Sequence, residues 1–325
     1  MILARLFITK TEKAQGEITM EQLMRDMFLF LSKNKVANKA AKKWGLRFGA
    51  NRFVAGETIK AAISTVKELN EKGIVATLDH LGEFVFSEEE AIESADYCIR
   101  TLEAIAEAGV KSNLSLKMTQ LGLDISKELC MKNMRRILDC AKRLNNFVRI
   151  DMEDYEHNQI TMDIFSELRE EYGETVGLVV QAYLYKVEQD IDELNKFKPN
   201  LRLVKGAYKE SPEVAFPAKE DVDRNFIKII EKHLLYGNYA AIATHDDNVI
   251  EHVKKFVKEH NIPFSQFEFQ MLYGIRVQRQ LELAKEGYTM RVYVPYGNDW
   301  YGYFMRRLAE RPANVAFVLK SMFKK

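Results

Sequence analysis

Two adjacent arginines near the end of the sequence are the first feature whose spacing suits chemistry. They lie in the stretch YFMRRLAERP, residues 303–312. On a helix, Tyr303 would face Arg306 and Arg307, three and four positions further on, and Glu310 would lie within ion-pair reach of both arginines. Two guanidinium groups near one point suit a small carboxylate or phosphate, because their planar donors bind such oxygens in pairs. The alternative interpretation is the solvated basic face of an amphipathic helix.

Eight short apolar runs elsewhere in the chain end in polar or reactive side chains. These side chains are Asp79 and His80, Lys117, Asp151 and Glu153, Gln181, Lys205 and Tyr208, Thr244 and His245, Gln270, and Tyr293. The carboxyl ends of the strands of a parallel barrel converge on one mouth, where catalysis takes place. A single such residue is explained by a strand running out into solvent, but eight together favour an enzyme over a scaffold.

The eight runs alternate with helical patterns along the chain. They span residues 73–83, 113–122, 147–154, 176–185, 201–208, 240–247, 267–274 and 290–297. Parallel strands need helical crossovers, and burial on both faces gives apolar runs such as GLVV and AAIA. We therefore predict an α/β fold, a (β/α)8 barrel over residues 71–325. A doubly wound open sheet is the alternative, although the sequence has neither a GxGxxG nor a GxxxxGK[ST] motif.

The segment before the first strand and the first barrel helix have their own patterns. Residues 1–70 are helical in pattern and rich in lysine, and we predict extra helices packed on the barrel there. Ser87 is a suitable N-cap for a helix over residues 87–109. Glu90, three positions later, would complete a capping box.

Composition narrows the class of protein. The 325 residues are 47% hydrophobic and 29% charged, with a net charge of +1, so no global basic field would attract nucleic acid. The three cysteines, Cys98, Cys130 and Cys140, show no CxxC spacing, which predicts buried thiols in a reducing compartment. The sequence shows neither a signal-peptide pattern nor an apolar run of membrane-spanning length. We expect a cytoplasmic protein.

Other chemistries remain as alternatives at this stage. Of the six histidines only His80 and His245 fall at strand ends, and HxH and HExxH motifs are absent, so we predict no metal site. A GxSxG elbow is absent too. Lys117 and Lys205 could form a Schiff base in a lyase, or act as charge partners of Asp151 or of a ligand anion. A non-catalytic module that binds a small carboxylate is a further alternative.

Several motifs together resemble one known family. VRIDMED, VVQAY, RLVKGAY, ATHD, FEFQMLYG, RVYVPYG and YFMRRLAERP are similar to motifs of the proline dehydrogenase family, flavoenzymes that oxidise L-proline to 1-pyrroline-5-carboxylate. The similarity runs from about Lys117 to Pro312 in the family's order and falls on the predicted strand ends. The chain's length resembles the stand-alone bacterial form, which lacks the aldehyde dehydrogenase domain of the bifunctional proteins.

The resemblance implies a role for each matching residue. Asp151 matches the active-site aspartate, and Arg202 matches the arginine near the reactive N5 of the flavin. The positions implied to hold FAD are Met152, Gln181, Arg202, Val204, Lys205, Gly206, Thr244 and His245. The positions implied to bind proline are Lys117, Tyr208, Leu272, Tyr293, Tyr303, Arg306, Arg307 and Glu310. Among these, Arg306, Arg307 and Lys117 would contact the carboxylate, and Tyr293 at the end of the eighth strand favours proline over hydroxyproline.

The family also implies partners beyond proline and FAD. Hydride would pass to flavin N5, a membrane quinone would reoxidise the flavin, and 1-pyrroline-5-carboxylate dehydrogenase would take the product, in the first step of proline catabolism to glutamate. A quinone partner adds a peripheral contact at the inner face of the cell membrane. The stretch MFLFLSKNKVANKAAKKW, residues 27–44, mixes apolar and basic residues that suit such a contact. Packing of this stretch against the barrel is the alternative.

Overall fold

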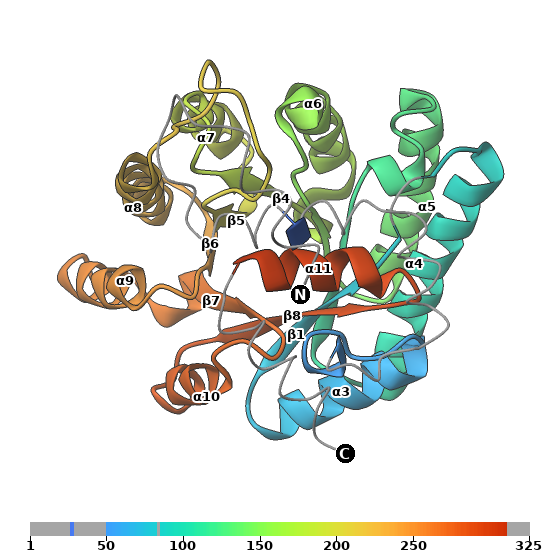
Figure 1. The fold of residues 1–325 in the computed structure, drawn as a ribbon, viewed down its shortest axis with the longest axis horizontal. Helices are drawn as coiled ribbons and strands as arrows, with labels where there is room; N and C mark the ends of the chain where they lie inside the picture. Colours follow the sequence, from blue (N-terminus) through green and yellow to red (C-terminus); the bar gives the residue numbers. More distant parts are fainter. Residues whose placement is uncertain (1–26, 29–49, 83–84, 311–325) are drawn as a thin grey trace, which may run out of the picture. The chain divides into compact units, whose positions relative to one another are not determined.

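The computed structural model describes residues 27–28, 50–82 and 85–310 of the chain (Figure 1). The chain divides into two compact units. One comprises Gly45–Trp300, and the other comprises Met1–Trp44 together with Tyr301–Lys325. The structure describes each unit by itself. The division of the sequence at residue 70 into an N-terminal segment and a catalytic barrel stays a prediction.

Eight parallel strands close into a barrel in the unit Gly45–Trp300 (Figure 1). They are β1 Val75–His80, β2 Ser112–Leu116, β3 Val148–Ile150, β4 Val176–Gln181, β5 Asn200–Val204, β6 Tyr239–Ala243, β7 Phe267–Leu272 and β8 Met290–Tyr296. Each strand pairs with the next in sequence, and β8 closes the ring on β1 through the register Thr77 to Tyr293. The predicted (β/α)8 barrel is confirmed, and the doubly wound alternative is wrong.

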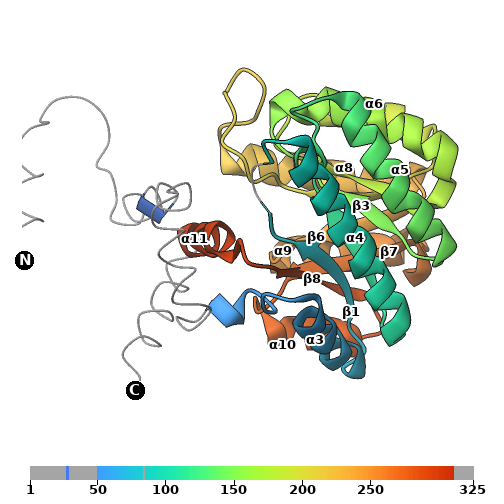
Figure 2. The same cartoon turned by 90° about the vertical axis from the view of Figure 1, so that its right-hand side faces the viewer.

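Helices follow the strands and cover the outside of the barrel (Figure 2). They are α4 Glu88–Ala108, α5 Lys127–Arg143, α6 Tyr155–Tyr172, α7 Val187–Asn195, α8 Lys219–Tyr236, α9 Asp247–Glu259 and α10 Val277–Lys285. Helix α11, Trp300–Glu310, follows β8. Short 3-10 turns lie at η2 Ala50–Arg52, η3 Thr119–Leu121, η4 Gly173–Thr175 and η5 Phe264–Gln266.

One helix of the predicted N-terminal set is described. Helix α3, Ile59–Glu71, is capped by the Thr58 side chain and packs against β1, β8 and α4. Apart from Met27 and Phe28, the candidate membrane stretch at residues 27–44 lies outside the described residues.

The strands carry polar side chains on one face and apolar side chains on the other, although both faces are buried. On β1, Thr77 and Asp79 are as inaccessible as Leu78 between them. Successive side chains of a strand point to opposite faces. The Tyr293 hydroxyl on β8 donates to Asp151, which follows the non-adjacent strand β3, so this polar face lines the barrel interior. The apolar face packs outward, against the helices.

The predicted N-cap of helix α4 is confirmed, but the predicted capping box forms only in part, because Glu90 reaches the N–H of Phe86 rather than that of Ser87. The Ser87 Oγ accepts a hydrogen bond from the Glu90 backbone N–H at 3.2 Å, and the Glu90 carboxylate accepts one from the Phe86 N–H at 2.7 Å. The helix ends at Gly109, whose φ of 62° is the left-handed conformation that glycine adopts at low cost.

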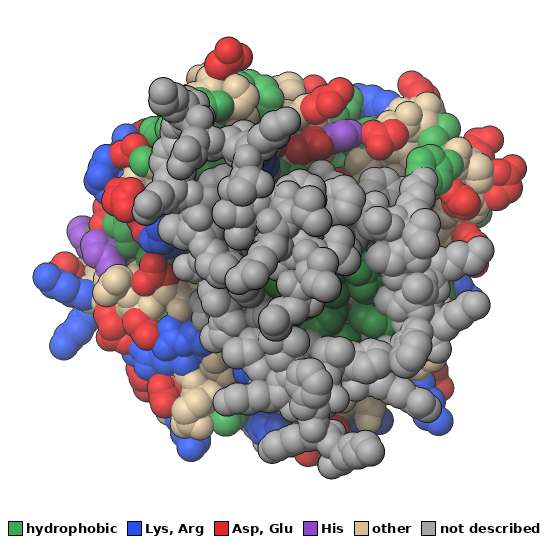
Figure 3. All heavy atoms as spheres, viewed as in Figure 1, with side chains coloured by type: hydrophobic (Ala, Val, Ile, Leu, Met, Phe, Trp, Pro, Cys, Tyr) green, Lys and Arg blue, Asp and Glu red, His purple; other side chains and the backbone are tan. Residues whose placement is uncertain are grey.

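The thiols and the surface charges also agree with what the sequence predicts. Cys98, Cys130 and Cys140 are free and buried, as predicted, and burial raises the pKa of the Cys98 and Cys130 thiols to about 12. On the face shown in Figure 3, acidic and basic side chains are intermixed around the periphery. None of the described helices is both long enough and apolar enough to cross a membrane.

The Ser87 N-cap gives a test of the fold. Replacing Ser87 by Ala removes the acceptor for the Glu90 N–H, so we expect the free energy of unfolding to fall by about 1 kcal/mol. Urea denaturation measures the change. The matched control is Ser94→Ala, inside the same helix, where alanine is a better helix former than serine. Equal stability of the two variants would contradict the capping role.

Candidate active site

Asp151 is the central residue of the carboxyl-terminal end of the barrel. It follows β3, where its backbone N–H donates to the Leu116 carbonyl of β2 at 2.8 Å. Its side chain accepts hydrogen bonds from the Ser115 hydroxyl at 2.7 Å, the Arg202 guanidinium at 2.8 Å and the Tyr293 hydroxyl at 2.8 Å. Side chains from β2, β5 and β8 therefore meet on one carboxylate.

Electrostatics keep this carboxylate ionised. Burial by itself raises the pKa of Asp151, but the charges of Lys117 and Arg202 lower it more, so its pKa lies below the ordinary value. The same pairing acts on Lys117. Burial lowers the pKa of that ammonium, whereas Asp79 and Asp151 raise it well above the ordinary value. Lys117 is thus a fixed ammonium group, and the predicted pairing with Asp151 is confirmed at 3.4 Å.

Arg202 lies inside the barrel rather than at its rim. It is the third residue of β5 and is 5% exposed. Its guanidinium donates to the Ser115 hydroxyl at 3.2 Å and lies 5.2 Å from the centre of the Tyr293 ring. Its buried Nε has no hydrogen-bond partner among the described residues. This cation is held rigidly while one donor stays available.

The structure corrects the position of Tyr293. The sequence predicted it at the end of the eighth strand, but β8 continues to Tyr296, so Tyr293 lies within the strand and its hydroxyl reaches Asp151. Pro295, two positions later, pairs with β1 in register with Asp79.

The residues that resemble flavin-binding positions follow β3, β4, β5 and β6. Gln181 ends β4, donates to the Glu153 carbonyl at 2.9 Å, and keeps a buried amide oxygen without a partner among the described residues. Met152 is buried after β3, and Val204 ends β5 half-buried. Gly206 has a φ of +115°, and a Cβ there would lie 2.5 Å from the Tyr183 ring, so only glycine fits.

Three further positions of this group already have protein partners. The Lys205 ammonium lies 2.6 Å from Asp223 and 3.1 Å from Asp246. The Thr244 hydroxyl accepts from the Asp246 N–H at 3.1 Å, and His245 Nε2 accepts from the Leu272 N–H at 3.1 Å. Lys205 therefore pairs with Asp223 and Asp246 rather than with Asp151. An anion bound beside Lys205 would share the ammonium group with these two carboxylates.

The remaining positions that resemble substrate-binding residues of the family belong to different units of the chain. Leu272 ends β7 and Tyr208 lies after β5 with 40% of its surface exposed. Tyr303, Arg306, Arg307 and Glu310 lie on α11, which confirms the predicted helix. From Tyr301 onward this helix belongs to the second unit, so its approach to the barrel mouth stays a prediction.

Two residues near Asp151 were noted in the sequence only as strand ends. Asp79, on β1, lies 3.5 Å from the Lys117 ammonium. Glu153 accepts hydrogen bonds from the N–H and the hydroxyl of Thr119, at 3.2 and 2.7 Å. Ser115 was missed entirely. Its signal was the alternation of polar and apolar residues in NLSLK, which places Asn113, Ser115 and Lys117 on one face.

The strand-end histidines have other roles. His80 stacks on Tyr97 with ring centres 3.9 Å apart, and burial lowers its pKa to about 4. No group of three or more potential metal ligands lies together in the part of the chain that the structure describes.

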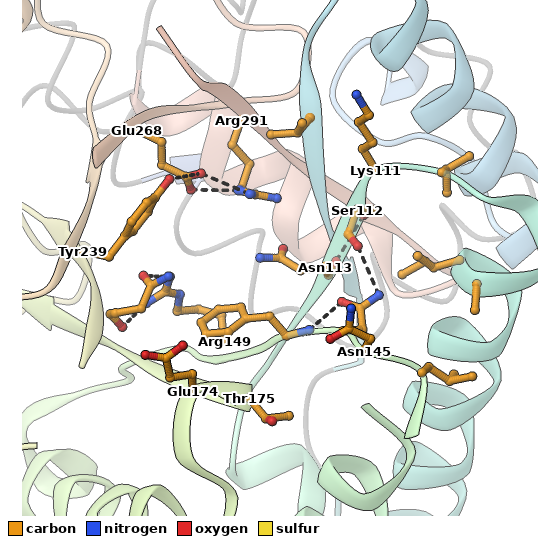
Figure 4. Close-up of a pocket in the computed structure, with 18 of the residues that line it drawn as sticks. Lys111, Ser112, Asn113, Asn145, Arg149, Glu174, Thr175, Tyr239, Glu268 and Arg291 are labelled. Atoms are coloured by element: carbon orange, nitrogen blue, oxygen red, sulfur yellow. Dashed lines mark hydrogen bonds and ion pairs between the residues drawn. The ribbon is translucent and has the colours of Figure 1, made fainter. Parts of the chain in front are cut away.

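The opposite end of the barrel holds a second set of charges. A cavity of about 660 Å³ opens where the strands begin, and its lining includes Arg149, Tyr239, Glu268 and Arg291 (Figure 4). Glu268 accepts from Arg291 at 2.7 Å and from the Tyr239 hydroxyl at 3.0 Å, while Arg149 donates to the Asn200 carbonyl at 2.6 Å. These groups largely satisfy one another, as expected of the stabilising end of a barrel.

Comparisons with known proteins agree with this geometry. The family model described as proline dehydrogenase matches residues 62–320. Proline dehydrogenase 1 of Bacillus subtilis subsp. natto is 57% identical over 93% of this chain and 100% of that protein. The proline dehydrogenase of Deinococcus radiodurans is 45% identical over 94% of this chain and 99% of that protein.

A solved structure extends the similarity to the fold. Proline utilization A (PutA) from Bdellovibrio bacteriovorus, inactivated by N-propargylglycine, aligns with a TM-score of 0.79 and 25% identity, over 96% of this chain and 40% of that larger one. The fold of this chain is thus shared with part of that protein. The chain belongs to the proline dehydrogenase family.

Proposed function

We propose that this protein oxidises L-proline to 1-pyrroline-5-carboxylate with FAD as its cofactor and a membrane quinone as the final electron acceptor. Family membership supports the substrate and the place in proline catabolism. The observation that carries the proposal is the cluster of Asp151, Lys117, Arg202 and Tyr293 at the barrel mouth. It supplies fixed charges of both signs in a buried place, as transfer of a hydride between two bound molecules requires.

The residues at the mouth fit a flavin. The unpartnered amide oxygen of Gln181 and the unpartnered Nε of Arg202 are buried polar atoms that a polar cofactor would satisfy. Gly206, with its positive φ, lets the chain turn after β5 while the Tyr183 ring packs against it. Met152, Val204, Lys205, Thr244 and His245 would complete the cofactor contacts. When bound, FAD supplies the acceptor for the hydride.

The chain's own groups would then place proline and balance charge. Arg306 and Arg307 would bind the carboxylate with Lys117, while Tyr208, Leu272, Tyr293 and Tyr303 would enclose the ring and Glu310 would pair with an arginine. Arg202, fixed by Asp151 and Ser115, would stabilise negative charge that develops beside it. Asp151, held ionised, would orient the cations.

The lysine-based lyase is less well supported. A Schiff base needs a neutral amine, and the pKa of Lys117 is raised well above its ordinary value by Asp79 and Asp151. The Lys205 ammonium is already paired with the carboxylates of Asp223 and Asp246. Neither lysine has the desolvated, unpaired environment that activates an amine.

The first test is optical. The purified protein is expected to be yellow, and its flavin absorbance should bleach when L-proline is added without oxygen. Cyclopentanecarboxylate, which has a ring and a carboxylate but no amine, serves as the control. It should leave the flavin absorbance unchanged. A colourless protein that FAD cannot reconstitute would rule the proposal out.

The two arginines of α11 give a second test. Arg306→Lys and Arg307→Lys each remove a planar pair of donors, so we expect the KM for proline to rise about tenfold to a hundredfold while bound FAD is retained. Arg224→Lys, an exposed arginine paired with Asp221 on α8, is the matched control. An unchanged KM in both α11 variants would return that helix to a solvated basic face.

Tyr293 gives a third test, of substrate choice. Tyr293→Ser removes a ring that would pack against proline, so relative kcat/KM for hydroxyproline over proline should rise by about tenfold. Tyr293→Phe keeps the ring and loses only the hydrogen bond to Asp151, so its preference should remain with proline. The same selectivity in the serine variant as in wild type would argue against the contact.

A further inference from the structure

The proposed function assigns no role to Asp79, although Asp79 belongs to the same cluster as Asp151 and Lys117. It lies on β1 in register with Ser115 and is 2% exposed. Its Oδ2 lies 3.5 Å from the Lys117 ammonium, and its buried Oδ1 has no hydrogen-bond partner among the described residues. An unmatched carboxylate oxygen in the interior is costly, so packing and stability do not explain why an acid stands here.

Asp79 and Asp151 compete for one cation. The Lys117 ammonium lies 3.5 Å from Asp79 and 3.4 Å from Asp151, almost equally far from both. Asp151 has further donors in Arg202 and Ser115, whereas Lys117 is the only salt-bridge partner that the described residues offer Asp79. The Tyr293 hydroxyl is shared between the two carboxyl groups. The described donors therefore stabilise a negative charge on Asp151 more than one on Asp79.

Charged and titratable groups face Asp79 from several elements. The groups that face it are Cys98 on α4, Lys117 after β2, Asp151 after β3, and Tyr293 and Tyr296 on β8. Burial raises the pKa of Asp79, Lys117 and Tyr293 lower it, and Asp151 raises it, with a net upward shift. Two carboxyl groups whose pKa values are pushed apart in this way take different protonation states.

The protonation state of Asp79 decides the charge that an incoming ligand meets. With Asp79 ionised, the cations Lys117 and Arg202 are balanced by two carboxylates. With Asp79 neutral, they face only Asp151, and the cluster carries one positive charge in excess. A low-dielectric site with an excess positive charge favours an anion.

We propose that Asp79 is a positioning and specificity-determining residue, a neutral carboxyl group that holds the Lys117 ammonium in place while leaving the cluster one positive charge with which to bind the carboxylate of the substrate. The inference rests on the proposed function and deepens it. Asp79 does not touch the reacting atoms; it acts through Lys117. Its proton exchanges with solvent, so no oxidant or further reactant is involved.

The consequence is a pH dependence of carboxylate binding. Because the pKa of Asp79 is raised, its neutral form persists below that pKa and is lost as the pH rises through it. Binding of an anion should therefore be tightest at the lower pH and weaken as the pH rises. Lys117, Tyr293 and Cys98, all with raised pKa values, keep their charge states around neutral pH.

The test measures binding of cyclopentanecarboxylate to the flavin-loaded enzyme by calorimetry from about pH 6.5 to 9, where this probe stays ionised. It has the ring and carboxylate of proline without the amine, so substrate protonation does not interfere. The wild-type Kd should rise as the pH increases through the pKa of Asp79. Asp79→Asn, which is neutral at every pH, should keep the tight Kd throughout.

Glu153→Gln is the matched control. Glu153 is the neighbouring buried carboxyl group whose pKa burial also raises, but its hydrogen bonds go to Thr119. This variant should keep the pH dependence. Proline kinetics add a second readout, because Asp79→Asn should lower KM relative to wild type at the higher pH with little change in kcat.

The outcomes separate the two proposals. A wild type that oxidises proline but binds the probe equally at every pH overturns the role of Asp79, as does a pH dependence that persists in Asp79→Asn or vanishes in Glu153→Gln. A wild type that neither oxidises proline nor binds the probe overturns the proposed function, and with it the inference.

Discussion

The ionised carboxylate of Asp151 is the interaction on which the barrel mouth depends. Ser115, Arg202, Tyr293 and Lys117 all direct hydrogens at it, and they come from strands or strand ends all around the ring. A buried charge is tolerated only when it is paired and hydrogen-bonded. Removing Asp151 would leave two cations without their common partner, so the positions of Lys117 and Arg202 follow from it.

That arrangement is possible because the strands separate polar from apolar side chains. Leu78, Leu114 and Ile150 pack outward against the helices, and the residues beside them point into the barrel. The interior still has to make room. A Cβ on Gly177 would lie 2.8 Å from the Arg149 guanidinium and 2.5 Å from the Asn200 carbonyl, so the glycine gives Arg149 its place. Apolar packing outside the barrel thus supports a charged column within it.

The sequence predicts local features better than contacts across the barrel. The eight strands, the Ser87 cap and the buried cysteines follow from periodicity and capping patterns, which are properties of neighbouring residues. Asp79 was recognised only as a strand end because its partner Lys117 is 38 positions away. Arg149 and Glu268 were not identified at all, since a charged residue within an apolar run shows its purpose only when the ring closes. The misplacement of Tyr293 within β8 has the same cause.

The two ends of the barrel use similar residues for different purposes. At the amino-terminal end, the carboxylate of Glu268 is matched by Arg291, Tyr239 and Gln270, and the guanidinium of Arg149 lies over the Phe147 ring, 4.7 Å from its centre. One buried polar atom at that end, Arg149 Nε, has no hydrogen-bond partner among the described residues, whereas at the mouth three residues, Asp79, Gln181 and Arg202, each keep such an atom. A fold selected for stability alone would have matched these atoms or replaced them with apolar groups. Their presence at the mouth is therefore best explained by molecules that bind there. The stability supplied by the amino-terminal end allows the mouth to keep these polar atoms unmatched.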